Sequence, residues 1–254
     1  MRNIQLSALS ITVFFFLGSL DKAMASDKWQ FEISPYAWAT TLEGDVGVRS
    51  LNSNVDVSLL DLMKDADSWL AILGHMELRN GKTAFFFEGN YVNLEFDGSS
   101  GPIRTSVEST LGILELGVAH EIARWGVDQP TVAEALGGLR YTSIESSIDL
   151  IPGPAAELSK DWFDPFVGFR TRTDLTDKIQ LRLRGDFGGF GVGSDSTWQA
   201  IGLLVFDVPF LGQQTEAGIG YRALRQNYSE GSGTSRFKWH TTLHGPLVGL
   251  SFKF

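Results

Sequence analysis

One set of side chains in this sequence has the composition of a hydrolytic centre. His75 and Glu77 are two positions apart, so on an extended strand they share a face, and Ser34 lies in an earlier extended segment. A serine that is activated by a histidine, with a carboxylate orienting the ring, can attack an ester or amide carbonyl. A long connection separates the two strands, so the sequence leaves the register of Ser34 against His75 open. We favour the interpretation that His75 takes part in an interior polar network.

A glycine-rich stretch, RGDFGGFGVGSDSTWQ (Arg184 to Gln199), can be interpreted in three ways. A phosphate-binding loop needs a lysine or a G-x-G-x-x-G pattern between a strand and a helix, and the stretch has neither. Calcium-binding glycine–aspartate repeats work in stacks, whereas this stretch occurs once. The stretch therefore predicts architecture: the end of one strand, a turn and the start of the next strand.

The elements that must position these residues are strands. Hydrophobic and polar residues alternate along most of the chain, as Val248, Leu250 and Phe252 do in the terminal segment GPLVGLSFKF. Short connections alternate with mostly longer ones, and the strand count is even. The sequence therefore predicts an all-β fold, a single antiparallel up-and-down transmembrane β-barrel of about ten strands, with eight or twelve as alternatives. The predicted strands are residues 29–39, 69–79, 82–96, 103–122, 131–147, 162–173, 178–191, 198–206, 215–228 and 240–254.

One hairpin predicts a register as well as a strand pair. Asn80 and Gly81 form the strongest short signal for a two-residue β-turn, which would place Arg79 opposite Lys82. The apolar faces of both strands then lie on the same side. A shift of one residue would place them on opposite sides.

If the apolar face of each strand meets lipid, the other face encloses the lumen. That inner face carries six carboxylates and six guanidiniums, in a lumen that is narrow at ten strands. Paired charges would fill it, because an unpaired buried charge is costly and an Arg–Glu fork satisfies both groups. The sequence therefore predicts a plugged interior rather than an open pore. The predicted network consists of Glu32, Glu77, Glu88, Glu115, Glu134, Glu216, Arg140, Arg170, Arg172, Arg182, Arg184 and Arg222.

The tryptophans and the last residues support a membrane barrel. All seven tryptophans fall at the ends of predicted strands, and indole rings favour the headgroup region, so they predict an aromatic girdle. Phe252 and Phe254 resemble the assembly signal in the terminal strand of outer-membrane barrels. The predicted girdle consists of Trp29, Trp38, Trp69, Trp125, Trp162, Trp198 and Trp239.

The first 25 residues have the pattern of a cleaved signal peptide: Arg2, an apolar core ITVFFFLG, and AMA before the predicted cleavage site. Residues 26–254 would then form a single barrel domain. The chain has no cysteine, which excludes disulfides and a thiol nucleophile. Its net charge of −9 argues against nucleic acid as a partner.

Several segments resemble a family of uncharacterised Gram-negative outer-membrane β-barrel proteins, the small porin-like or OmpA-like barrels. They are PYAWATTLEGDVGV, VDVSLLDLM, DWFDPFVGFR, RGDFGGFGVGSDSTWQ, GIGYRALRQNY and HGPLVGLSFKF. The resemblance implies export to the outer membrane and contact with its lipid and lipopolysaccharide. It also implies assembly by the barrel-assembly machinery through the C-terminal strand, and it brings no catalytic residue.

Metal and cofactor sites are not predicted. Five aspartates between residues 40 and 67 could hold calcium or magnesium against lipopolysaccharide phosphates, but we favour a solvated acidic loop. Its apolar part, VDVSLLDLMKDADSW, predicts a short helix. We expect a non-enzymatic barrel with a structural or surface ligand-binding role. A narrow channel for small solutes and an outer-membrane hydrolase using His75 are the alternatives, and a soluble ligand-binding barrel would need the faces reversed.

Overall fold

The computed structural model describes residues 29–49, 51–100, 103–151, 153, 155–209 and 214–254. The predicted leader, residues 1–25, lies outside this described part of the chain, so its cleavage stays a prediction. Among these described residues, no helix has the length and hydropathy needed to cross a membrane.

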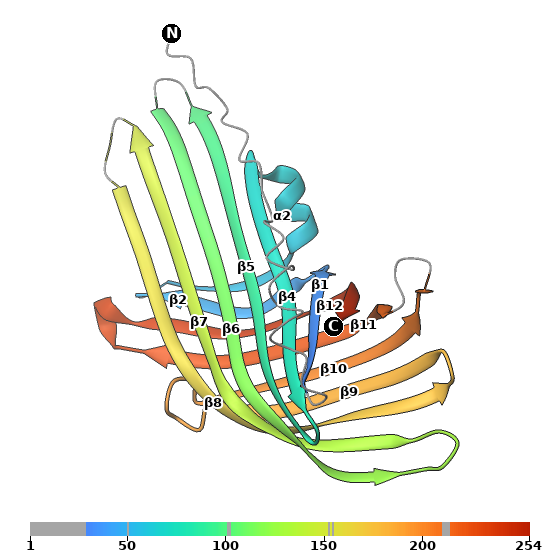
Figure 1. Ribbon diagram of the computed structural model, residues 1–254. Helices are drawn as coiled ribbons and strands as arrows, with labels where there is room; N and C mark the ends of the chain where they lie inside the picture. The colour runs from blue at the N-terminus through green and yellow to red at the C-terminus, as the bar shows by residue number, and fades with distance from the viewer. Residues whose placement is uncertain (1–28, 50, 101–102, 152, 154, 210–213) are drawn as a thin grey trace.

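Ten antiparallel strands form a closed barrel, which confirms the predicted fold class (Figure 1). Closure comes from the pairing of the first and last strands, with Glu32 opposite Lys253 and Trp38 opposite Leu247. The barrel strands are β1 (Trp29–Trp38), β4 (Ser68–Asn80), β5 (Thr83–Ser100), β6 (Ile103–Trp125), β7 (Thr131–Ile151), β8 (Ala155–Thr176), β9 (Ile179–Gly188), β10 (Ser196–Asp207), β11 (Thr215–Glu230) and β12 (Phe237–Lys253). A 3₁₀ turn, η2 (Gly233–Ser235), precedes β12.

The strands β5 to β8 are much longer than a membrane requires. β6 has 23 residues, which at about 3.3 Å per residue gives a strand about 75 Å long, whereas a tilted strand crosses a bilayer with about 9–11 residues. The strands are therefore long enough to extend beyond such a thickness, and they project at the end where β5 meets β6 and β7 meets β8. We call this the extended end, and the opposite end, with the turn between β4 and β5, the short-turn end. Figure 1 shows β5 to β8 as long, continuous ribbons.

The two faces of the sheet differ as the alternation predicts. On β6, Glu115 is 1% exposed and the adjacent Leu116 is 64% exposed. On β8, Arg170 lies in the lumen, whereas its neighbour Phe169 is 63% exposed. Charge inside and large apolar side chains outside is the pattern of a barrel whose outer surface contacts lipid.

The register of the β4–β5 hairpin differs from the prediction. Arg79 lies opposite Ala84 rather than Lys82, so Gly81 and Lys82 form the centre of the turn. Gly81 has a φ of +57°, which the first central position of a tight hairpin turn favours. The shift is two residues, a full pleat period, so both strands keep their predicted faces.

The connection between β1 and β4 is a folded element rather than a loop, but four of its aspartates, Asp56, Asp61, Asp65 and Asp67, are exposed to solvent as expected. It contains β2 (Thr41–Val48), β3 (Leu51–Ser58) and the predicted short helix, α2 (Leu59–Asp65). β2 pairs with the extended-end half of β12, from Thr41 opposite His244 to Val48 opposite Phe237. β3 pairs with β2. Alternating valines of this hairpin, Val46, Val55 and Val57, line the barrel interior, and their burial favours a hairpin over a loop.

The glycine-rich stretch is strand, turn and strand, as predicted. The turn covers residues 189–195 and is tied to β8: the backbone N–H and the hydroxyl of Ser194 donate to Asp164 at 2.6 and 2.8 Å. The indole N–H of Trp162 donates to the same carboxylate at 3.1 Å. The sequence pattern places Gly189 on the lipid face of a strand, but with a φ of +86° it begins the turn.

Two glycines on one face of β11 give a matched test of close strand packing. A Cβ on Gly220 would lie 1.9 Å from the carbonyl oxygen of Gly202, whereas a Cβ on Gly218 would meet nothing closer than 3.8 Å. We expect Gly220→Ala to lower the free energy of unfolding by about 1–3 kcal/mol, because a backbone carbonyl must move. Gly218→Ala should be neutral. Urea unfolding of the two variants in detergent checks this, and equal midpoints would contradict it.

Candidate functional site

A network of charged side chains crosses the barrel interior. Arg140 of β7 donates from Nε to Glu115 of β6 at 2.9 Å and from Nη2 to Asp186 of β9 at 2.8 Å. Arg184 of β9 donates from Nη2 to the second Glu115 oxygen at 2.7 Å and lies 2.9 Å from Asp186. Arg140 is 0% exposed and Glu115 is 1% exposed. Two guanidiniums and two carboxylates thus form a closed ring of ion pairs, shielded from solvent.

Arg222 of β11 extends this ring across the lumen. It bonds to Glu88 of β5 through Nη1, lies 3.4 Å from Glu115 through Nη2, and donates from Nε to Gln199 at 2.8 Å. Its guanidinium carbon lies 4.6 Å from the centre of the Trp38 ring. Around the barrel, β5 and β11 are separated by β4, β1 and β12, so this contact joins distant parts of the wall.

A second group of ion pairs lies closer to the short-turn end. Glu134 of β7 accepts hydrogen bonds from Arg170 at 2.5 Å and Arg172 at 3.2 Å, and forms an ion pair with Arg79 at 2.7 Å. Arg170 also donates to Glu77 at 2.7 Å. Because each carboxylate has several guanidinium partners, this group has the character of a network rather than of separate pairs.

A third group joins β9 to the strands at the seam of the barrel. Arg182 lies 3.4 Å from Glu32 of β1 and 2.5 Å from Glu216 of β11. Lys253, near the end of β12, pairs with Glu216 as well. The last strand is thereby held to the network by its charge as well as by its backbone.

The structure brings all twelve residues of the predicted network into ion pairs. Arg79, Asp186 and Lys253 also belong to the network, and the sequence prediction omits them. The two-residue alternation of strands could have identified Arg79 and Asp186, because Arg79 lies two positions after Glu77 and Asp186 two positions after Arg184 on the same strand. Lys253 lies opposite Glu32 only through the closure of the barrel, which the sequence does not specify.

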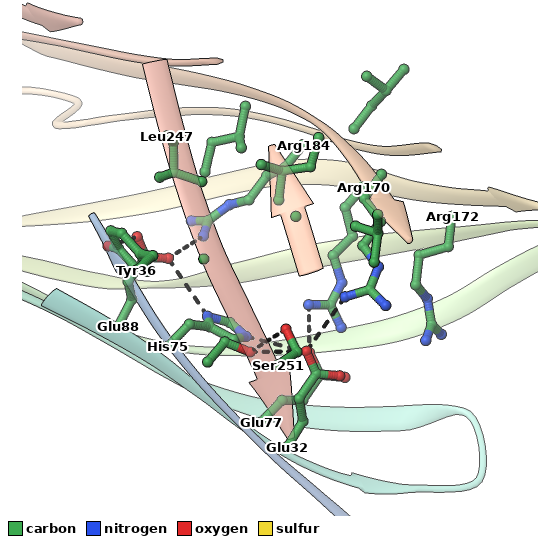
Figure 2. Close-up of a pocket in the computed structure, with 18 of the residues that line it drawn as sticks. Glu32, Tyr36, His75, Glu77, Glu88, Arg170, Arg172, Arg184, Leu247 and Ser251 are labelled. Carbon is green, nitrogen blue, oxygen red and sulfur yellow. Dashed lines mark hydrogen bonds and ion pairs between the residues drawn. The ribbon is translucent and has the colours of Figure 1, made fainter. Parts of the chain in front are cut away.

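His75 lies in a cavity of about 170 Å³ next to these ion pairs, lined by both charged and aliphatic side chains (Figure 2). Its Nδ1 is 3.6 Å from a Glu88 oxygen, and its Nε2 is 3.9 Å from a Glu77 oxygen. Both ring nitrogens thus face carboxylates. This arrangement suits a charged imidazole within a polar network.

Ser34 is the direct neighbour of His75 across the β1–β4 pair, a register that the sequence leaves open. Its hydroxyl, however, bonds to Glu32 at 3.1 Å and to Ser251 at 2.7 Å. The three candidate triad residues are therefore close together, but the serine hydroxyl is directed at groups other than the imidazole.

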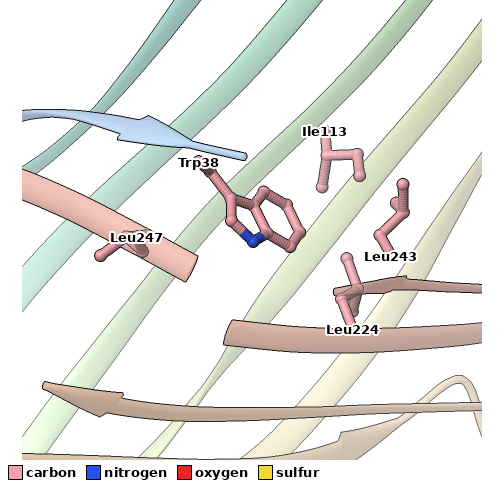
Figure 3. Packing of buried hydrophobic residues seen from close by; sticks show 5 residues of the cluster. All are labelled: Trp38, Ile113, Leu224, Leu243 and Leu247. Carbon is pink, nitrogen blue, oxygen red and sulfur yellow. The ribbon is translucent and has the colours of Figure 1, made fainter. Parts of the chain in front are cut away.

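Toward the extended end the interior is apolar, a feature that the sequence prediction missed. A cavity of about 350 Å³, called the chamber below, is lined by side chains from β1 to β8, β12 and α2. No acidic, basic or histidine side chain lines it. A packed cluster borders it on the side nearest the ion pairs (Figure 3); its members are Trp38, Ile113, Leu224, Leu243 and Leu247. The inner-face positions Leu73, Val92 and Leu111 signal this apolar half in the sequence, once the strand faces are assigned.

The predicted tryptophan girdle is wrong for three of its seven members. Trp38, Trp162 and Trp239 are 6%, 4% and 6% exposed, and they pack inside the barrel. Their place at strand ends has a different cause: the barrel interior is apolar toward the extended end and can bury indole rings. The other four are exposed, and their place in a girdle stays a prediction; they are Trp29, Trp69, Trp125 and Trp198. Trp69 lies opposite Leu94, so the alternation of β4 puts it on the inner face of the sheet.

The rim of the chamber at the extended end is held by aromatic and ionic contacts. Trp162 stacks on Tyr228 with ring centres 4.1 Å apart, and Tyr228 donates to Glu230 at 3.1 Å. Lys160 donates to Glu230 at 2.6 Å, and these hydrogen bonds, the lysine's first, hold the pKa of Glu230 below its ordinary value. The rim therefore joins β8 to β11 at neutral pH.

The C-terminal residues take part in barrel closure. Phe252 lies opposite Ile33, and the backbone N–H of Phe254 donates to the carbonyl of Phe31 at 2.8 Å. The rings of Phe31 and Phe254 stack with centres 6.1 Å apart. A role of these phenylalanines in assembly stays a prediction.

Comparisons with known proteins give the fold alone. No family model and no curated protein sequence matches the chain. Among solved structures, the outer membrane protease OmpT from Escherichia coli is similar with a TM-score of 0.52 at 7% identity, over 91% of this chain and 98% of that one. Ail, the attachment invasion locus protein of Yersinia pestis, aligns over 89% of this chain and 99% of its own, with a TM-score of 0.38 at 6% identity. The chain is thus a closed β-barrel with the fold of outer-membrane barrel proteins.

Proposed function

We propose that the protein is an integral barrel of the Gram-negative outer membrane, exported with residues 1–25 as a cleaved leader. In this proposal the barrel is non-enzymatic, is closed to the flow of solutes, and binds a ligand in its extended half. The observation that carries the proposal is the ion-pair network across the lumen, in which Arg140 and Arg222 are both 0% exposed. These guanidiniums and their carboxylate partners come from strands on different sides of the barrel and occupy space that an aqueous path would need at their level.

The outer surface supports contact with outer-membrane lipid and lipopolysaccharide. Leu116, Val167 and Phe169 are each at least 60% exposed and face away from the lumen. Such a surface is stable in hydrocarbon and is an aggregation hazard in water. The terminal strand, with Phe252 and Phe254, would be the part that the barrel-assembly machinery binds.

Two alternatives have weaker support. A channel needs open space at the level of Arg140, where the ion pairs close a ring. A hydrolase needs a serine hydroxyl bonded to an imidazole, whereas Ser34 bonds to Glu32 and Ser251. The contacts of Ser34, and those of His75 with Glu77 and Glu88, favour a structural role for these two residues.

Single-channel recording tests the closed barrel. We expect the wild-type protein, inserted into a planar bilayer, to show no stable conductance steps, because the buried ion pairs of Arg140 and Arg222 occupy the lumen. An open porin measured in the same bilayer is the positive control. Stable steps of porin size from the wild-type protein would contradict the proposal and favour the channel.

A further inference from the structure

The chamber contains hydrogen-bond donors that have no partner. Trp38 Nε1, Trp239 Nε1 and Asn90 Nδ2 are buried, and none of them bonds to another described group. All three side chains are at least 94% buried, and all three line the chamber. A buried donor without a partner costs about 1–3 kcal/mol, so such groups call for a ligand or water. Since all three are donors, acceptor oxygens would satisfy them. Trp38 lies opposite Leu247, and Trp239 is eight residues from Leu247 on β12, about 26 Å at about 3.3 Å per residue, so the two indoles call for separate acceptors.

The rest of the lining defines the remainder of the ligand. The lining has no charged side chain, so nothing in the chamber compensates the burial of an ionised headgroup. Most of the surface is aliphatic or aromatic, and apolar burial drives binding there. An apolar cavity of about 150 Å³ holds benzene, so a chamber of about 350 Å³ has room for about fourteen carbon-sized atoms.

The chamber also has a gap in its side wall. β4 pairs with β1 only from Gly74 to Asn80, so its first residues, from Ser68 to Leu73, pair with β5 alone among the described strands. β3 likewise has β2 as its one partner there. Two free strand edges therefore face the gap between β3 and β4, at a place where Ile72 is 61% exposed on the outer face.

Helix α2 covers this gap. The backbone N–H of Leu59, at its start, donates to Thr40 at 2.7 Å, and the N–H of Asp67, just after it, donates to Glu95 of β5 at 2.9 Å. Leu59 and Leu62 line the chamber, but no residue of the helix is buried. α2 is thus a thin cover over an apolar cavity, and it is held by backbone bonds at its two ends.

We propose that the chamber binds the hydrocarbon chain of an uncharged ester, with an ester oxygen accepting from Trp239, and that the chain enters sideways from the lipid beneath α2. The inference deepens the proposed function, because it names the ligand of the closed barrel. The proposed function and this inference can be disproved independently of each other. Conductance measurements test whether the lumen is closed, and retention of an ester tests whether the chamber binds it.

The probe is methyl dodecanoate, with fifteen non-hydrogen atoms, added to the purified protein in nanodiscs of saturated phosphatidylcholine. Native mass spectrometry counts the molecules that stay on the barrel after release from the disc. We expect one retained ester per barrel and at least tenfold weaker retention of dodecanoate, because its carboxylate would be buried without a partner. Equal retention of ester and carboxylate would overturn the proposal.

Variants on one strand separate the chamber from the lipid face. Leu111→Trp fills the chamber from β6, and Leu114→Trp adds the same ring to the outer face of that strand. We expect at least tenfold weaker retention in the first and less than a twofold change in the second. Ser109→Phe fills the same cavity if Leu111→Trp does not fold. Retention that survives both filling substitutions means binding at the outer surface only and overturns the proposal.

The donors are tested by comparing the ester with dodecane. Trp239→Phe keeps an aromatic ring in the lining and removes one donor, so the ester should bind about fivefold more weakly and dodecane equally well. Loss of both ligands to the same degree would mean that the indole N–H has no part in recognition.

The source of the chain and its route are two further measurements. An organic extract of protein purified from its own membrane distinguishes a membrane-lipid acyl chain from a free ester by mass; a barrel that retains neither contradicts the proposal.

For the route of entry, Leu62→Ala thins the cover, so exchange of bound ester should become several times faster while affinity changes little. An unchanged exchange rate would contradict entry beneath α2.

Discussion

Replacing Arg222 with methionine is expected to lower the free energy of unfolding by about 3–5 kcal/mol. Arg222 is 0% exposed and is the short-range ionic partner of Glu88; without it, Glu88 would keep the Tyr36 hydroxyl at 2.9 Å and Arg184 and His75, each at 3.6 Å. Methionine fills part of the volume but supplies no donor, so Glu88 would remain in the interior as an under-compensated charge. Urea unfolding of the refolded barrel in detergent, followed by tryptophan fluorescence, measures the loss.

Arg172→Met is the matched control. Arg172 belongs to the same network, but its side chain is 30% exposed and makes one ion pair, at 3.2 Å with Glu134. The expected loss is below about 1 kcal/mol, as for other solvent-accessible pairs. A double variant, Arg222→Met with Glu88→Gln, should recover part of the larger loss, because the unpaired charge is then gone. If Arg222→Met and Arg172→Met lower the free energy of unfolding equally, the buried ion pair contributes no more to stability than the solvent-accessible one.

The strand pattern could be predicted from sequence because one physical rule governs every strand. Lipid outside and charge inside impose a period of two, so Glu115 and Leu116 could be assigned to opposite faces without knowledge of any contact. The same rule allowed the twelve charged residues to be assigned to the inner face from sequence. It does not say which carboxylate meets which guanidinium, because that depends on registers between strands that are far apart in sequence.

Register is where local signals were insufficient. At the β4–β5 turn, Asn80-Gly81 marks the position of the turn, but Asn80 pairs with Thr83, so Gly81 is the first rather than the second central residue. Across the β1–β4 pair no turn exists to set the register, since β2, β3 and α2 lie between. The neighbours Ser34 and His75 could therefore be identified as candidates but not placed.

The chamber could not be predicted from the rule that identified the barrel. That rule treats the inner face as polar along its whole length, whereas Leu73, Val92 and Leu111 make it apolar toward the extended end. Indole rings at strand ends satisfy both a lipid girdle and an apolar interior. Only the burial of Trp38 and Trp239 separates these two interpretations.

Asp164→Ala is expected to destabilise the barrel by about 3 kcal/mol and to loosen the glycine-rich turn. The Asp164 carboxylate is 0% exposed and accepts three hydrogen bonds, two from Ser194 and one from the indole of Trp162. Alanine leaves these donors unsatisfied in a place that water does not reach, at about 1–3 kcal/mol for each such group after partial relaxation. Residues 189–195 would then lose their side-chain tie to β8, keep the bond from the backbone N–H of Gly189 to Pro165, and become accessible to protease.

Asp161→Ala provides the comparison, because Asp161 is an exposed carboxylate three positions earlier on β8. Its removal should change the free energy of unfolding by less than about 0.5 kcal/mol and leave the turn intact. Limited proteolysis in nanodiscs, with the cleavage site located by mass spectrometry, reports the turn separately from global unfolding. If Asp164→Ala is destabilised without cleavage between residues 189 and 195, the carboxylate stabilises the core near Trp162 and not the turn. If it is neither destabilised nor cleaved, the turn is held by its own backbone conformation.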